Sequence, residues 1–185
     1  MATLRLPPMV TDGGVRSGLG WLAASFLLLG AVSILVPAAA TLAVTLLVAA
    51  TLLFWGGLGV WMSLSLRDLP EWKLSAAAFG LVAALGLAFL VFPGAGAEVM
   101  TLFVVAGFLI EGVFSILFAL RLSGRASGWG WMAASGAAAL VLGLVVLIGW
   151  PDTATWLLGL LIGVNFLTTG AALLALRVTM GPAAR

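Results

Sequence analysis

Cysteine, histidine and tyrosine are all absent from this chain of 185 residues. Without thiols or imidazoles the chain cannot form disulfides, bis-histidine haem ligation, thiol redox centres or the usual catalytic triads. The commonest ligands of transition metals are missing for the same reason. We therefore expect no cofactor and no metal. A membrane enzyme is the function that this composition disfavours most.

Charged residues are scarce as well. They make up only 8% of the chain, whereas apolar residues make up 64%, and the mean hydropathy is +1.30. A soluble domain of this size needs far more charge to cover its surface, so this chain requires lipid as its solvent. The net charge of +2 does not indicate a nucleic-acid partner, because the eight basic residues are scattered singly and form no patch.

Six long apolar stretches are separated by breaks that carry proline or glycine. A bilayer core of about 30 Å needs roughly 20 mostly apolar helical residues. Each stretch is close to that length, and Glu111 is their only charged residue. The predicted spans are residues 19–36, 41–64, 74–92, 99–120, 130–149 and 153–176. We therefore predict an all-α membrane protein with six transmembrane helices.

The break at Pro37 is the least obvious, because no polar residue surrounds it. If Pro37 only kinked a helix, residues 21–62 would form a helix of about 63 Å, twice the core thickness. A turn at the membrane interface is the physical solution. Arg5 and Arg16, followed by an apolar run and three alanines from Ala38, also imitate a secretory signal peptide. The run is longer than a typical signal sequence, so we predict that it is a retained helix.

The basic residues predict the orientation. With six crossings all of them fall on one side of the membrane, and the opposite connections carry only Glu98 and Asp152. The positive-inside rule assigns the basic side, including both ends of the chain, to the cytoplasm. The basic residues are Arg5, Arg16, Arg67, Lys73, Arg121, Arg125, Arg177 and Arg185. Every tryptophan except Trp55 lies at a predicted helix end, as expected for indoles at the headgroup level.

A pattern of proline and glycine recurs three times. The prolines are Pro37, Pro93 and Pro151, and the residue nineteen positions after each is Gly56, Gly112 and Gly170. Glycine also precedes the first two prolines by seven residues (Gly30, Gly86) and the third by eight (Gly143). Each unit contains two crossings, so the repeats are parallel. The predicted segments are a cytoplasmic tail (1–17), three helical hairpin repeats (18–66, 67–122 and 123–178) and a second cytoplasmic tail (179–185).

Close helix packing is predicted at small residues spaced four apart. Glycine and alanine at this spacing allow the backbones of neighbouring membrane helices to approach each other. The pairs are Gly80/Ala84, Ala139/Gly143 and Gly159/Gly163.

This pattern resembles the HdeD-like acid-resistance membrane proteins, a bacterial family built from short two-helix repeats of undetermined function. The resemblance is carried by Gly20-Trp21, by the glycine seven residues before Pro37 and Pro93, and by the glycine nineteen residues after each proline. It extends over residues 18–178, although the third unit departs from the glycine–proline spacing by one residue. The resemblance implies a six-helix fold in the bacterial plasma (inner) membrane and a role connected with acid stress.

Glu111 is the one ionisable residue inside a predicted span. A charged, unpaired carboxylate there costs several kcal/mol. Gly107, Glu111 and Ser115 are spaced by four, so they share one helix face that is suited to packing against a neighbour. Two interpretations stay open: a proton-titrating or cation-contacting site, or a neutral glutamic acid hydrogen-bonded between helices. Any proton relay would lack a second ionisable partner.

Asn165 is the other strongly polar side chain within a span, and Thr168 and Thr169 lie close to it. In the repeat alignment Thr169 corresponds to Glu111, and Asn165 to the position of Gly107. A threefold arrangement would allow Glu111 and Asn165 to meet. The candidate intramembrane polar site therefore comprises Glu111, Ser115, Asn165 and Thr169, with hydrogen bonding between helices as the expected role of Asn165.

The short connections and the lack of a predicted soluble domain favour a non-catalytic membrane protein with a stress-related, membrane-organising or accessory-subunit role. Its expected partners are membrane lipids, together with other membrane-protein subunits or further copies of the chain. The alternative is a small transporter or channel, proton-linked through Glu111. A transporter requires a water-accessible cavity that reaches this carboxyl group.

Overall fold

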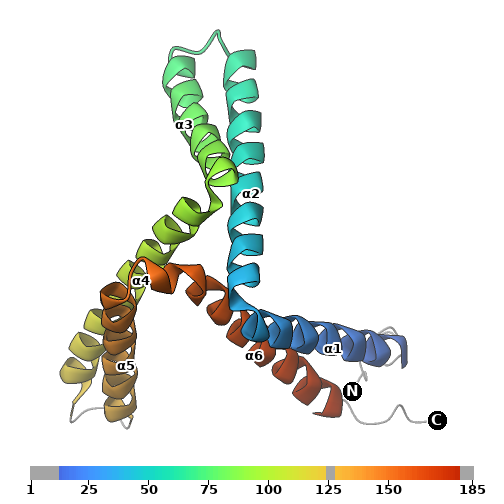
Figure 1. Cartoon of the computed structure of the whole chain (residues 1–185), viewed down its shortest axis with the longest axis vertical. Coiled ribbons are helices and arrows are strands. Elements are labelled where there is room, and N and C mark those ends of the chain that lie inside the picture. Colours follow the sequence, from blue (N-terminus) through green and yellow to red (C-terminus); the bar gives the residue numbers. More distant parts are fainter. Residues whose placement is uncertain (1–12, 124–127, 180–185) are drawn as a thin grey trace, which may run out of the picture. The chain divides into compact units, whose positions relative to one another are not determined.

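Six apolar helices and one short 3-10 turn form the described part of the computed structural model, residues 13–123 and 128–179 (Figure 1). The helices are α1 (Gly13–Leu35), α2 (Pro37–Ser65), α3 (Trp72–Val91), α4 (Pro93–Leu122), α5 (Trp129–Ile148) and α6 (Leu157–Thr179), with the 3-10 turn η2 (Asp152–Thr155) between α5 and α6. The predictions for Arg5, Arg125, Arg185 and most of the two tails concern residues outside this description.

All six helices are long and apolar enough to cross a membrane, which confirms the predicted number of spans. The last span differs in its start, because residues 152–155 form η2 and α6 begins only at Leu157. The hydroxyl of Thr153 donates a hydrogen bond of 2.9 Å to the carbonyl of Val146, near the end of α5. This bond satisfies one of the carbonyls left free at a helix end and stabilises the turn instead of a longer helix.

The first two repeat prolines begin helices. Pro37 is the first residue of α2, and Pro93 is the first residue of α4. Proline is favoured at this position because its ring fixes a helical φ and the amide hydrogen that it lacks would have no partner there. A single residue, Val36 or Phe92, separates each of these helices from the one before. Pro151 differs, since it precedes η2 rather than a transmembrane helix.

The helices lie side by side in three pairs, α2 with α3, α4 with α5, and α1 with α6 (Figure 1). The pair of α1 and α6 brings together segments from opposite ends of the sequence, and the rings of Phe26 and Phe166 pack edge to face at 5.4 Å between centroids. The chain divides into two compact units, one containing this pair and the other extending from Ala38 to Leu158.

The packed pairs are offset by one helix from the predicted repeat segments 18–66, 67–122 and 123–178. In the unit that contains α3 and α4, the two helices contact each other near their junction, where Gly96 lies against Phe89. Axes of packed helices are 8–10 Å apart, a distance that one connecting residue spans poorly. The longer connection between Ser65 and Trp72 allows α2 and α3 to pack along their length. The α2–α3 and α4–α5 hairpins therefore have their loops at the predicted cytoplasmic end.

The glycines of the sequence repeat mark the crossing points of these hairpins. A Cβ atom added to any one of them would lie 3.1 Å or less from an atom of the partner helix. The glycine pairs are Gly56 and Gly86 for α2 and α3, Gly112 and Gly143 for α4 and α5, and Gly170 and Gly30 for α6 and α1. Each pair combines a glycine after one proline with a glycine before another, so the three hairpins use equivalent contacts.

Two of the three predicted small-residue steps supply such contacts. Gly163 packs against the carbonyl of Gly30, and Gly143 packs against Phe108 and Leu109. The step at Gly80/Ala84 was predicted wrongly, because Ala84 is exposed and the nearest atom to a Cβ at Gly80 is 4.0 Å away. The close approach on α3 falls instead at Ala83 and Gly86. The spacing of four shows correctly that Gly80 and Ala84 share one face of α3. The face of α3 that packs closely against α2 is the neighbouring one, which contains Ala83 and Gly86.

Candidate functional site

One buried stripe runs along the second helix of each of the first two repeats. Its residues stand 4, 8, 12, 19 and 26 positions after the repeat proline, and the glycines at position 19 contact the hairpin partner, whereas Thr45 at position 8 lies against Gly96 of α4. They are Thr41, Thr45, Ala49, Gly56 and Ser63 in α2, and Ala97, Thr101, Val105, Gly112 and Ala119 in α4. Because most of these side chains are small, the two backbones lie close together, and packing rather than polarity holds each hairpin.

Glu111 lies on a different face of α4 from the buried stripe. At 100° per residue, Glu111, which stands 18 positions after Pro93, lies about 100° around the helix from the stripe residue at position 19. Glu111 and Asn165 are both exposed in the chain, while Ser115 and Thr169 are half-buried. The hairpins therefore leave the strongly polar side chains uncovered.

Glu111 extends from α4 beside the α4–α5 contact without entering it. Its neighbour Gly112 packs against α5, whereas a Cβ at Gly107 would meet no atom within 4 Å. Ser115 is the member of the predicted set that reaches the contact, where its Cβ atom lies beside Gly136 of α5. Within the described residues Glu111 makes no hydrogen bond or ion pair. Ser115 therefore belongs to the α4–α5 contact, whereas the carboxyl group of Glu111 lies outside it.

Asn165 and Thr169 belong to α6, in the other compact unit. The backbone carbonyl of Asn165 accepts a hydrogen bond of 2.8 Å from the hydroxyl of Thr168. The amide side chain of Asn165 is exposed. A contact between Glu111 and Asn165 would join the two units, and it stays a prediction.

The proline ends of α2, α4 and η2 form a small cavity, which we call the proline-end cavity. Its volume is about 210 Å³. It is lined by Ala38, Thr41, Leu42, Gly94, Ala97, Glu98, Ala154 and Thr155. These residues stand 1, 4 and 5 positions after Pro37 and Pro93, and 3 and 4 positions after Pro151. All three repeats therefore contribute near-equivalent positions to one cavity, and Glu98 is its single ionisable lining residue.

The sequence analysis did not identify two buried threonines that lie near the proline-end cavity. Thr45 and Thr101 both stand eight positions after their prolines, and neither side chain is exposed. The hydroxyl of Thr45 donates a hydrogen bond of 2.9 Å to the carbonyl of Thr41, whereas that of Thr101 has no hydrogen-bond partner among the described residues. The matching proline–threonine spacing in the first two repeats was the signal that could have identified them.

These features define a multi-pass membrane protein built from repeated helical hairpins. The family model described as "Short repeat of unknown function (DUF308)" matches the chain twice, over residues 21–85 and 80–148. Together the two matches cover more than half of the sequence, and the chain belongs to this family. Each match begins in the first helix of one repeat and ends in the first helix of the next, or at its end. No curated protein and no solved structure matches the chain significantly.

Proposed function

We propose that the chain is an HdeD-like, non-catalytic protein of the bacterial plasma membrane that acts as an accessory or membrane-organising subunit. The observation that carries this proposal is the uncovered position of Glu111. A carboxyl group within a span is unfavourable against lipid, and such groups normally face a protein or a water-filled cavity. The α4–α5 hairpin does not cover Glu111, so another helix surface is needed to accept it.

The repeat pattern supports the HdeD-like part of the proposal. The match to a short membrane repeat of unknown function agrees with the glycine and proline spacing on which the resemblance rests. A family named for acid stress suggests that the accessory role serves acid survival. The absence of histidine, cysteine and tyrosine from the sequence supports a non-catalytic role.

Substituting Glu111 tests the accessory role. Glu111→Gln keeps a hydrogen-bonding group, so it should preserve association with the partner, whereas Glu111→Leu should weaken it. Hydrogen bonds between membrane helices contribute about 0.6–2 kcal/mol, which corresponds to a roughly 3- to 30-fold loss of association. The measurement is the fraction of chain in complexes extracted from native membranes into polymer-bounded nanodiscs, with acid survival measured in parallel. Val113→Leu, at an exposed position on the same helix, is the matched control.

Transport is the alternative function, favoured only by the presence of an ionisable group within a span. Glu111 does not line the proline-end cavity, nor a second cavity at the loop end of the α2–α3 hairpin. If Glu111→Gln abolished proton flux in proteoliposomes while the protein remained folded, the transport function would replace the accessory one. Parental flux and parental association in both Glu111 variants would contradict both functions.

The proposed orientation can be tested directly because the chain lacks cysteine. Gly94→Cys and Thr155→Cys should react in intact cells with a maleimide that cannot cross the membrane. Leu69→Cys and Ser123→Cys, at the loop ends of the hairpins, should react only after the membrane is opened. All four positions are exposed, so accessibility within the chain does not bias the comparison. The reverse labelling pattern would overturn the assignment of the basic side to the cytoplasm.

A further inference from the structure

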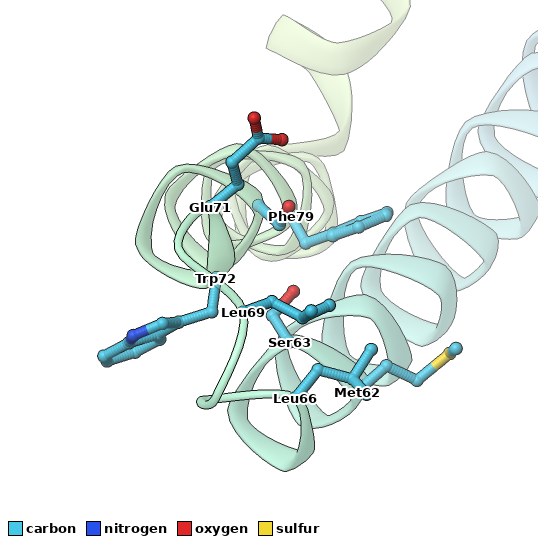
Figure 2. A pocket seen from close by; sticks show the side chains of 8 residues that line it. Met62, Ser63, Leu66, Leu69, Glu71, Trp72 and Phe79 are labelled. Atoms are coloured by element: carbon cyan, nitrogen blue, oxygen red, sulfur yellow. The ribbon is translucent and has the colours of Figure 1, made fainter.

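The loop end of the α2–α3 hairpin contains a second cavity of about 250 Å³, here called the loop-end pocket (Figure 2). Four apolar side chains line it, namely Met62, Leu66, Leu69 and Phe79, and the remaining lining residues are Ser63, Glu71, Trp72 and Ser75. In Figure 2 Glu71 and Trp72 extend in opposite directions from the start of α3, with Leu69 and Phe79 nearby. The pocket is therefore apolar within and carries polar groups at its edge.

Two cations gather at the edge formed by Trp72. The Cζ atom of Arg67 and the Nζ atom of Lys73 each lie 5.8 Å from the centroid of a Trp72 ring. The indole attracts both cations, although they repel each other. Within the described residues neither cation forms an ion pair, and Asp68 and Glu71 form none either. This leaves two neighbouring cations without a counterion and a carboxylate in the pocket lining without a cation.

The pocket occupies the level at which a membrane-spanning hairpin meets lipid headgroups. Tryptophan favours this level, and Trp72 stands at the first residue of a span. A phospholipid there presents a phosphate to nearby cations and an acyl chain to apolar side chains. A purely anionic headgroup would neutralise the cations but would leave Glu71 unpaired. A headgroup with a primary ammonium supplies a partner for that carboxylate as well.

We propose that the loop-end pocket binds a zwitterionic aminophospholipid, with its phosphate at Arg67 and Lys73, its ammonium at Glu71 and the start of one acyl chain against Leu69 and Phe79. Charge complementarity selects the headgroup, because the cations and the carboxylates in this loop balance each other. Charge-assisted hydrogen bonds from an ammonium are stronger than the contacts of a trimethylated amine, which has no hydrogen to donate.

Lipid binding by the purified full-length chain tests this proposal. Native mass spectrometry would compare phosphatidylethanolamine, phosphatidylcholine and phosphatidylglycerol with identical acyl chains. We expect phosphatidylethanolamine to bind about tenfold more tightly than phosphatidylcholine. Glu71→Gln should abolish that preference, and the double variant Arg67→Gln, Lys73→Gln should weaken the binding of both lipids. Glu98→Gln and Arg121→Gln remove comparable charges elsewhere and should change neither property.

Four outcomes would overturn the proposal. Equal binding of all three lipids would show that headgroups are not distinguished, and tighter binding of phosphatidylglycerol would show an anionic-lipid site. An undiminished preference in Glu71→Gln would exclude the role of that carboxylate. Glycerophosphoethanolamine, which lacks acyl chains, should bind far more weakly than the lipid, and equal binding would show a site for the free headgroup instead. Circular dichroism confirms that each variant is folded.

Discussion

Gly56→Ala is expected to lower the free energy of unfolding by about 2 kcal/mol, whereas Gly57→Ala leaves it unchanged or raises it slightly. A Cβ at Gly56 would fall against the backbone nitrogen and Cα of Ala83 on α3, and backbone atoms cannot rotate away from it. A Cβ at Gly57 would meet nothing within 4 Å. Both substitutions give α2 the same gain in helix propensity, so their difference isolates the packing of α2 on α3.

The measurement is reversible unfolding in mixed micelles, followed by the loss of helical circular dichroism as the denaturing detergent increases. Equal stability of the two variants would contradict the close crossing of α2 and α3. A larger loss for Gly57→Ala would indicate that the opposite face of α2 is the packed one. Gly112→Ala in α4, with Gly107→Ala as its control, should repeat the result because the α4–α5 hairpin uses the equivalent contact.

Gly30→Leu is expected to separate α1 from α6, with a loss of about 3 kcal/mol. A Cβ at Gly30 would lie 2.8 Å from the carbonyl oxygen of Gly163 and 2.8 Å from the backbone nitrogen of Leu167. A leucine side chain there requires the two helices to move apart. Gly18→Leu, on the same helix, is the control, because a Cβ at Gly18 meets no atom within 4 Å.

A cross-linking assay measures directly whether α1 and α6 lie side by side. Phe26→Cys and Phe166→Cys supply the only two thiols in the chain, at positions whose rings pack together in the parent. A short bifunctional thiol reagent should join them within one chain, and the yield should fall severalfold when Gly30→Leu is added. An unchanged yield, or equal falls with Gly30→Leu and Gly18→Leu, would contradict the α1–α6 hairpin.

The sequence predicted the helices well because their ends carry strong local signals. Pro37 and Pro93 lie at the first residue of a helix, where the ring is tolerated, and the glycines around them mark places where no side chain fits. The start of α6 was misjudged because Pro151 and Thr153 form a turn that depends on the carbonyl of Val146, a contact that residue type alone does not reveal.

Which helices pair could not be predicted from the sequence. Each helix is apolar around its whole circumference, so no polar face excludes a neighbour. The same ambiguity affects the candidate site. The spacing of Gly107, Glu111 and Ser115 shows that they share a face, but only the positions of Gly112 and Gly136 show that most of this face lies outside the hairpin contact. The loop-end pocket was also missed, because the mixed charges of its loop resemble an ordinary solvated connection.

Because α6 packs on α1, the pairing of successive repeats forms a closed cycle in which the last repeat pairs with the first. The second helix of each repeat packs on the first helix of the next, and the second helix of the last repeat packs on the first helix of the first. The guanidinium of Arg177 lies against Gly20, so the C-terminal part of α6 lies beside the N-terminal part of α1. The two helices are therefore antiparallel, like the helices of a hairpin that a loop connects. Joining α6 to α1 and opening the chain between Leu66 and Trp72 would retain all three glycine crossings. The repeating structural unit is therefore the glycine-crossed hairpin, which combines the second helix of one repeat with the first helix of another.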